Sequence, residues 1–415
     1  MKRAPATLAA LVFVASGLAQ EKPKSVTVPI TLDHNRTIID VYLALPDGGT
    51  KRVRGWVDNG NPELEITDAL AQKLGLQFKG EGNAKAGDER PVDAPRSLQI
   101  GGMAVPFDQI KQAKAIVGRE SIAPGSSAEI NIPSTVLRNY DVQFDYPNRQ
   151  FTIGPPGSIS FQGTPTKVQI NPQNGLIQIA SKIDGAEHTV SFDAGSSISL
   201  LAADLLDKWL KAHPSWPHLT GAIGSANMWG ADDEAKWQLL RISNLDFGGS
   251  PLKNVVVASF PAKYMKWYQD RAGVPTIGLI GASAFVDSRV GIDYAHNTLY
   301  IQRTQTKRAP DMDVVGLTLR PEPDEKYTVI GVVAYNGKPS VADVKSGDTL
   351  VGVDGAPATG ATMGQVWSLL GGTPGTTRTL TLERDGKRFS VDATVRRFLA
   401  PAGNFSAKSK PKTNP

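Results

Sequence analysis

Short runs in which apolar and polar residues alternate fill most of the chain after residue 25. Residues 26–30 and 38–43 are two such runs, and the sequence Pro-Asp-Gly-Gly at 46–49 separates the second from the next. Alternation with a period of two is typical of half-buried strands, so the pattern predicts a mainly β protein rich in turns. Helical spacing is confined to a few segments: 67–74, 202–210, 363–370 and, with a weaker pattern, 264–271.

A repeat divides this β pattern into two similar halves. Residues 55–60 read Gly-Trp-Val-Asp-Asn-Gly and residues 190–195 read Val-Ser-Phe-Asp-Ala-Gly, and a short apolar run and a helical pattern follow each. Further along each half, Val-Gln-Phe-Asp-Tyr at 142–146 matches Val-Gly-Ile-Asp-Tyr at 290–294. Because two signals recur in the same order, the repeat predicts two β lobes of domain size.

A third unit begins after the polar stretch 302–308 and contains the helical segment 363–370. The polar end of the chain beyond residue 399 is not expected to pack. The predicted organisation is a signal peptide at 1–19, a first lobe at 20–157, a second lobe at 158–303, a linker at 304–312, a small β/α domain at 313–398 and a disordered basic tail at 399–415.

Composition narrows the possible chemistry. The chain has 415 residues, of which 40% are apolar and 20% charged, which suits two or three globular domains. The net charge of +5 is dispersed among acidic residues, so nucleic acid is not an expected partner. The absence of cysteine excludes disulfides and thiolate metal sites, and the five histidines lack a metal-ligand spacing. We expect neither a metal site nor a cofactor.

The first residues have the features of an export signal. Lys2 and Arg3 precede an uncharged, largely apolar stretch at 4–19, and Gly17 and Ala19 offer the small residues that a signal peptidase reads. The stretch is shorter than the roughly 20 residues of a membrane-spanning helix, so an uncleaved anchor is the weaker alternative. The pattern predicts a periplasmic or secreted protein without a stable membrane span after cleavage.

The two Asp-x-Gly sequences are the main candidates for chemistry. Two aspartates brought together by similar lobes, Asp58 and Asp193, cannot both ionise easily, so one would hold a proton while the other activates a water molecule. Gly60 and Gly195 would let the backbone approach these carboxylates closely. A single Asp-x-Gly would be interpreted as an ordinary β-turn, but two copies within a repeat favour a catalytic pair.

With these turns, the chain resembles bacterial retropepsin-like or pepsin-like aspartic proteases that carry a PDZ domain. The stretch Leu-Ile-Gly-Ala-Ser-Ala-Phe at 279–285 fits the apolar-apolar-Gly element of that family. The resemblance implies two β-barrel lobes with a catalytic dyad of Asp58 and Asp193, and it assigns support of the catalytic turns to these neighbours: Asn59, Gly60, Ala194, Gly195 and Ser196.

Departures from the family pattern leave the activity open. The family has Thr or Ser after each aspartate, whose hydroxyls bond across to the other lobe, whereas this chain has Asn59 and Ala194. Ala194 has no polar side-chain atom, so one arm of the contact between the lobes is expected to be missing. In the first lobe, Asn-Ile-Pro at 131–133 stands in place of apolar-apolar-Gly, and no tyrosine between Tyr42 and Tyr140 could act as a flap residue.

The third unit resembles the PDZ domains of bacterial periplasmic proteases, with its densest match at 344–355. Such domains bind a peptide as an added strand and capture a terminal carboxylate in a glycine-rich loop. The resemblance therefore makes protein C-termini possible partners, although packing in the core of a small domain is an equally good interpretation of the same side chains. The candidate peptide-binding residues are Val315, Gly316, Leu317, Met363 and Val366.

Two functions of different classes remain. The first is an exported aspartic endopeptidase that hydrolyses extended peptides or unfolded protein between the lobes. The second is a catalytically impaired protein that keeps the fold and only binds peptides. The paired aspartates and glycines favour the enzyme, and Asn59, Ala194 and Pro133 favour the binding protein.

Overall fold

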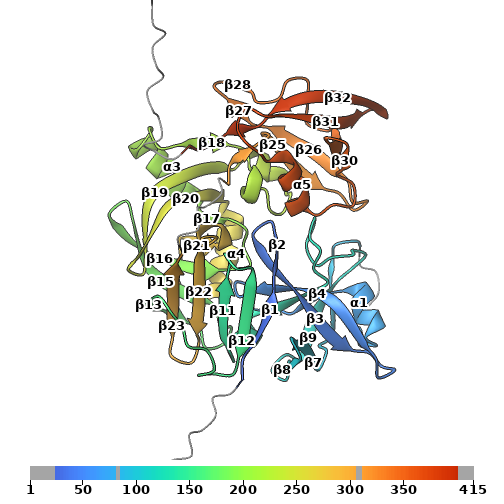
Figure 1. Ribbon diagram of the computed structural model, residues 1–415, viewed down its shortest axis with the longest axis vertical. Helices are drawn as coiled ribbons and strands as arrows, with labels where there is room; N and C mark the ends of the chain where they lie inside the picture. Colours follow the sequence, from blue (N-terminus) through green and yellow to red (C-terminus); the bar gives the residue numbers. More distant parts are fainter. Residues whose placement is uncertain (1–23, 81–84, 305–310, 401–415) are drawn as a thin grey trace, which may run out of the picture.

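The computed structural model describes residues 24–80, 85–304 and 311–400, arranged as two β lobes and a third domain (Figure 1). The proposed signal peptide, most of the linker and residues 401–415 of the tail lie outside the described residues. Met312 and Leu399, which the sequence placed in the linker and the tail, are both buried in the core of the third domain.

The first lobe is built on a nine-stranded sheet. Its strand β4 (Thr50–Asp58) ends at the first candidate aspartate and pairs in parallel with β10 (Ile130–Pro133). Thr67 caps the helix α1 through its hydroxyl, which accepts the N–H of Leu70 at 3.3 Å. The other elements are β2 (Thr31–Asp33), β3 (Arg36–Ala44), β5 (Glu65–Thr67), α1 (Asp68–Lys73), β6 (Glu89–Asp93), β7 (Ser97–Ile100), β8 (Met103–Pro106), β9 (Gln112–Ile116) and α2 (Ser134–Leu137).

The second lobe repeats this plan in an eight-stranded sheet that closes on itself through a pairing between β15 and β19. Its strand β16 (Ala186–Asp193) ends at the second aspartate and pairs in parallel with β21 (Gly278–Gly281). The remaining elements are β14 (Gln169–Ile170), β15 (Ile177–Ile183), β17 (Ser199–Ala202), α3 (Ala203–Ala212), β18 (His218–Thr220), η1 (Gly224–Ala226), η2 (Asp232–Lys236), β19 (Gln238–Phe247), β20 (Ser250–Phe260), α4 (Ala262–Ala272) and η3 (Ala282–Ala284).

The register of the strands shows how closely the two lobes correspond. Pro133 lies opposite Asp58, and Gly281 lies opposite Asp193, at the same position of the two parallel pairs. In the first lobe the strand after the turn, β5, pairs antiparallel with β10 and parallel with β9. In the second lobe the corresponding strand, β17, pairs antiparallel with β21 and parallel with β20. The repeat in the sequence therefore corresponds to a repeat in topology.

A six-stranded sheet joins the lobes along their common base. Its central strands are β11 (Asp141–Asp145) and β22 (Ser288–Asp293), which pair antiparallel with Phe144 opposite Val290 and Val142 opposite Ile292. These strands are the second repeated signal of the sequence. The outer strands are β1 (Val26–Pro29), β12 (Gln150–Gly154), β13 (Thr164–Lys167) and β23 (Thr298–Arg303).

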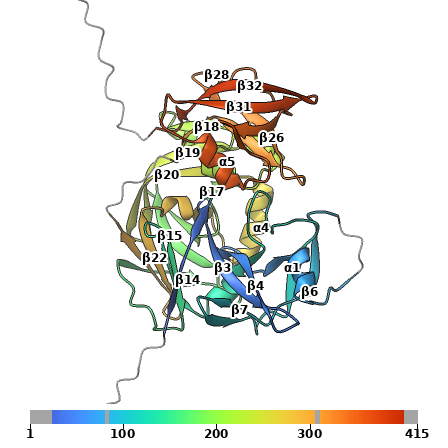
Figure 2. The ribbon, with the colours of Figure 1, turned by 45° about the vertical axis from the view of Figure 1, so that its right-hand side comes forward.

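The third domain lies at the opposite end of the molecule from this sheet (Figures 1 and 2). Helix α5 (Met363–Leu370) begins with a capping box formed by Thr362 and Gln365. One apolar core runs from the second lobe into this domain without interruption. The strands are β24 (Asp313–Val314), β25 (Leu317–Pro321), β26 (Tyr327–Val332), β27 (Ala334–Tyr335), β28 (Lys338–Pro339), β29 (Thr349–Val353), β30 (Ala356–Pro357), β31 (Thr377–Arg384), β32 (Lys387–Thr394) and β33 (Arg396–Arg397).

Candidate active site

Each candidate aspartate is the last residue of a strand and is held by the turn that follows it. Oδ1 of Asp58 accepts the backbone N–H of Gly60 at 3.1 Å. Oδ1 of Asp193 accepts the N–H groups of Gly195 at 2.8 Å and Ser196 at 3.0 Å. Both aspartates are buried, with 7% of the surface exposed in each. The turns thus fix two carboxyl groups inside the protein.

The two turns approach so closely that only glycine fits between them. A methyl group on Gly60 would overlap the carboxyl group of Asp193. A methyl group on Gly195 would overlap Oδ1 of Asp58 and lie 3.2 Å from Oδ1 of Asp193, so both carboxylates border the same point. These glycines are required by the close approach, and the structure brings together the pair that the sequence proposed.

Asn59 makes the contact between the turns from one side. Its Nδ2 donates to the carbonyl oxygen of Phe192 at 2.9 Å, and its Oδ1 accepts the N–H of Ala194 at 2.7 Å. The amide of Asn59 therefore supplies both a donor and an acceptor to the opposite lobe, through two different atoms. A Thr or Ser at this position would use its one hydroxyl oxygen for both bonds. Ala194 is fully buried and returns no side-chain bond, so the contact is one-sided.

Ser196 does not bond its hydroxyl to the aspartates. Its Oγ donates to the carbonyl oxygen of Ile198 at 2.7 Å and lies 3.6 Å from Sδ of Met228. In the first lobe, Pro133 occupies the place of Gly281, and buried Asn131 holds the chain after the turn. Oδ1 of Asn131 accepts the N–H of Glu65 at 2.7 Å. The unusual Asn-Ile-Pro element is therefore a polar support for the turn that follows Asp58.

Burial raises the pKa of both carboxyl groups, and the charge of the neighbouring carboxylate adds to the shift at Asp58. Burial, and after it the charges of Asp193 and Glu65, raises the pKa of Asp58 well above its ordinary value. Burial also raises the pKa of Asp193 to about 6, although the N–H groups of Ser196 and Gly195 oppose the shift. The burial of two adjacent carboxyl groups therefore favours a state in which the pair keeps one proton.

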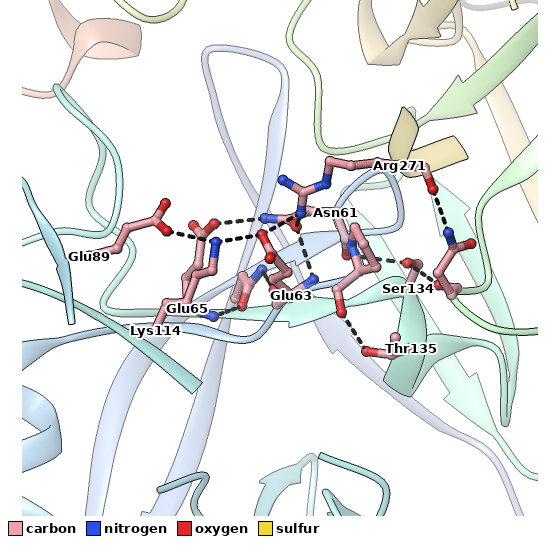
Figure 3. Close-up of polar contacts among 11 residues, drawn as sticks. Asn61, Glu63, Glu65, Glu89, Lys114, Ser134, Thr135 and Arg271 are labelled. Atoms are coloured by element: carbon pink, nitrogen blue, oxygen red, sulfur yellow. Dashed lines mark hydrogen bonds and ion pairs between the residues drawn. The ribbon is translucent and has the colours of Figure 1, made fainter. Parts of the chain in front are cut away.

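A polar network joins the segment after the Asp58 turn to the second lobe through α4 (Figure 3). The Arg271 guanidinium donates to Oδ1 of Asn61 at 2.7 Å and to Oε2 of Glu63 at 2.5 Å. Lys114 of the first lobe also contacts Glu63, at 2.9 Å. Ser134 adds a bond from its backbone N–H to the carbonyl oxygen of Asn61 at 2.9 Å.

Two side chains near the dyad were not found from the sequence. Tyr268 of α4 is buried, and burial together with the charge of Asp193 raises its pKa. Arg36 of β3 is fully buried beside Trp56, two residues before Asp58. Tyr268 lies in the predicted helix 264–271, and Arg36 lies just before the predicted strand 38–43. The sequence pattern does not mark either residue as a neighbour of the aspartates. The repeated aspartates Asp145 and Asp293 lie away from the dyad, paired with Arg289 and His296 respectively.

The candidate peptide-binding residues of the third domain are all buried: Val315, Gly316, Leu317, Met363 and Val366. Strand β25 is an edge strand, and its residue Leu319 is bonded by the second lobe. Nδ2 of Asn227 donates to the carbonyl oxygen of Leu319 at 2.8 Å, and Oδ1 accepts its N–H at 3.0 Å. Ile223, Ala226 and Met228 share the same apolar core with the candidate residues. The second lobe's own segment 222–229 thus covers this edge.

The sequence matches no protein-family model and no curated protein. Among solved structures, the aspartic proteinase from Irpex lacteus matches with 13% identity and a TM-score of 0.38, over 69% of this chain and 99% of that chain. This likeness is too distant to carry an argument about the fold or the function. The topology itself shows that the body of the chain is mainly β and consists of two lobes with a repeated plan, as the sequence predicted.

The described residues were also compared with the requirements of a metal site and of a membrane-spanning helix. In the ranges 24–80, 85–304 and 311–400, no three His, Asp or Glu side chains gather as metal ligands would. Within the same ranges no helix combines the length and the apolar character needed to cross a membrane.

Proposed function

We propose that the chain is an aspartic endopeptidase that hydrolyses extended peptides or unfolded proteins, with Asp58 and Asp193 as its dyad. The observation that carries the proposal is the pair of opposed carboxyl groups at equivalent turns of the two lobes. Ionised Asp193 would take a proton from a water molecule as the water oxygen attacks the peptide carbonyl carbon. Protonated Asp58 would give its proton to the carbonyl oxygen, and collapse of the tetrahedral intermediate would release the amine.

The raised pKa values set the expected pH range. Below about pH 6 both aspartates hold protons, so no base activates the water. Above it Asp193 would ionise while Asp58, whose pKa is also raised by burial and by the charge of the neighbouring carboxylate, would keep the remaining proton of the pair. Activity should therefore rise through about pH 6 and fall again when Asp58 ionises, which places the optimum nearer neutrality than acid.

The competing function is a peptide-binding protein without catalysis. The burial of both aspartates and the missing side-chain bond from Ala194 favour it. Against it, Asn59 supplies a donor and an acceptor to the opposite turn, so the dyad keeps a hydrogen-bonded support. We therefore prefer the enzyme.

For the third domain we propose a PDZ-like role in recognising peptides or protein C-termini. The outward N–H and carbonyl of Leu319 on an edge strand, beside α5, are what an added strand would pair with. Because Asn227 holds both groups, a peptide must displace segment 222–229 in order to bind. Export to the periplasm or the outside remains part of the proposal and rests on residues 1–19.

Cleavage of casein across about pH 4 to 8 tests the proposed enzyme. Wild type should cleave, and Asp58→Asn and Asp193→Asn should each abolish cleavage. Asp293→Asn is the matched control, because this aspartate occupies a repeated position but bonds only to His296 among the contacts described. Absence of cleavage in the wild type, or equal cleavage by wild type and Asp193→Asn, would favour the peptide-binding protein.

A further inference from the structure

The turn that joins β2 to β3, from Asp33 to Asn35, connects the third domain with the turn that holds the second aspartate. On one side, Oδ1 of Asp33 accepts the hydroxyl of Thr362 at 2.7 Å and the N–H of Gly364 at 3.2 Å, at the beginning of α5. On the other side, Nδ2 of Asn35 donates to the carbonyl oxygen of Ser197 at 3.2 Å. Figure 1 shows the β2–β3 hairpin reaching toward α5. We call this turn the first arm.

Segment 222–229 of the second lobe makes the same two kinds of contact, and we call it the second arm. Its Asn227 bonds to the edge strand β25 of the third domain. The carbonyl oxygen of Ser225, in the same segment, accepts the hydroxyl of Ser197 at 2.8 Å. One arm from each lobe therefore lies between the third domain and the turn after β16.

The two arms lie where a substrate would have to enter. Both arms bond to Ser197, two residues after Gly195, which faces Asp58 across the dyad. Asp58 and Asp193 are each only 7% exposed. Hydrolysis requires the peptide carbonyl and a water molecule to lie within contact distance of both carboxyl groups. Because the dyad is buried, the arms must part before an extended peptide can bind.

The third domain fits too closely against the first lobe for the first arm to move alone. A Cβ on Gly364 would overlap Oδ1 of Asp33 and the backbone nitrogen of His34. Beside it, the N–H of Met363 donates to the carbonyl oxygen of Gly125 in the first lobe at 2.7 Å. Parting of the arms therefore requires the third domain to leave its place.

We propose that the docked third domain autoinhibits the peptidase by clamping the two arms over the dyad, and that substrate enters when the domain undocks. The inference rests on the proposed peptidase function and adds its regulation. A minor conformation of a protein is commonly populated at about 10% or less. The wild type would then cleave through this open fraction, at about a tenth or less of the rate of a fully open protein.

Gly364→Leu tests the clamp in the full chain, because leucine suits a helix but does not fit against Asp33 and His34. We expect a larger radius of gyration in X-ray scattering and faster amide exchange at 195–198. The initial rate of casein cleavage should be about tenfold or more above that of the wild type. Ser368→Ala is the control and should behave as the wild type, since this exposed hydroxyl bonds only within α5 among the contacts described.

A cross-link makes the opposite change. A Cβ on Gly331 of β26 would lie 3.0 Å from Cβ of Ala235 in the second lobe, and a disulfide needs about 3.5–4.5 Å, so a small shift lets Gly331→Cys pair with Ala235→Cys. The chain has no other cysteine. The oxidised protein should cleave casein about tenfold or more slowly than the same protein after reduction, because the domain cannot undock.

The outcomes separate the clamp from the peptidase. Equal exchange at 195–198 and equal cleavage in the wild type and an undocked Gly364→Leu would overturn the clamp. If Gly364→Leu stays docked, equal cleavage by the oxidised and reduced cysteine pair would overturn it. Faster exchange at 195–198 in Gly364→Leu, without cleavage by any of the proteins, would support the clamp and contradict the peptidase alone.

Discussion

At the scale of single residues, Asn59 joins the turns that follow the two candidate aspartates. Its amide bonds to Phe192 near the end of β16 and to Ala194 in the turn that follows, and both residues are buried. The orientation of the amide is fixed, because a backbone N–H can only donate and a carbonyl can only accept. The sequence identified Asp58 and Asp193 from their repeated context, but it could not show that one asparagine would serve as both donor and acceptor.

Replacing Asn59 separates this role from the chemistry of the aspartates. Asn59→Ala leaves a buried N–H and a buried carbonyl unpaired, so we expect the free energy of unfolding to fall by about 2–4 kcal/mol. Asn59→Thr offers a hydroxyl that can donate and accept and should lose less. Urea unfolding measures both variants, and equal stability of Asn59→Ala and wild type would show that the contact contributes nothing.

At the scale of secondary-structure elements, α4 of the second lobe contacts the segment that follows Asp58 in the first lobe. Arg271, in its last turn, contacts Asn61 and Glu63, which directly follow Asp58 and its glycine turn (Figure 3). Although burial opposes it, the cations Lys114 and Arg271 hold the pKa of Glu63 below its ordinary value. The helix itself was predictable from apolar spacing at 264–271, but its contact across the lobes depends on tertiary packing that no local pattern encodes.

Arg271→Met and Lys114→Met form a matched pair, because each removes one cation from Glu63 but only Arg271 crosses between the lobes. We expect Arg271→Met to cost about 1 kcal/mol, since the pair is partly exposed, and to speed amide exchange at 61–65. Hydrogen exchange followed by mass spectrometry measures this change. Equal acceleration in Lys114→Met would mean that the contact between the lobes has no special role.

At the scale of the whole molecule, the third domain is held on the body by contacts to both lobes, and the segment 222–229 of the second lobe makes one of them. Asn227 bonds to Leu319, and Glu234 holds Asn227 through a bond of 2.5 Å. Burial raises the pKa of Glu234 to about 7, although the N–H of Trp229 and the Asn227 amide oppose the shift. The helices at the four segments with helical spacing could be predicted from the sequence. This docking could not, because its apolar residues fit the core of a single domain equally well.

Asn227→Ala tests the docking. The variant leaves the outward N–H of Leu319 without its partner, so we expect faster exchange of that amide and a larger radius of gyration in X-ray scattering. Thr379→Ala is the control, since its hydroxyl bonds to Asp392 within the third domain. Unchanged exchange and scattering in Asn227→Ala would show that the apolar core alone holds the domain in place.

The proposed chemistry depends on Asp58 and Asp193 facing each other closely enough to share one proton. A ¹³C NMR titration of the Asp58 carboxyl in wild type and in Asp193→Asn measures that interaction. In wild type we expect a pKa for Asp58 well above the ordinary value, because of burial and the neighbouring charge. In Asp193→Asn the pKa should fall but stay raised, since burial remains. The same pKa in both proteins would show that the two carboxyl groups do not interact.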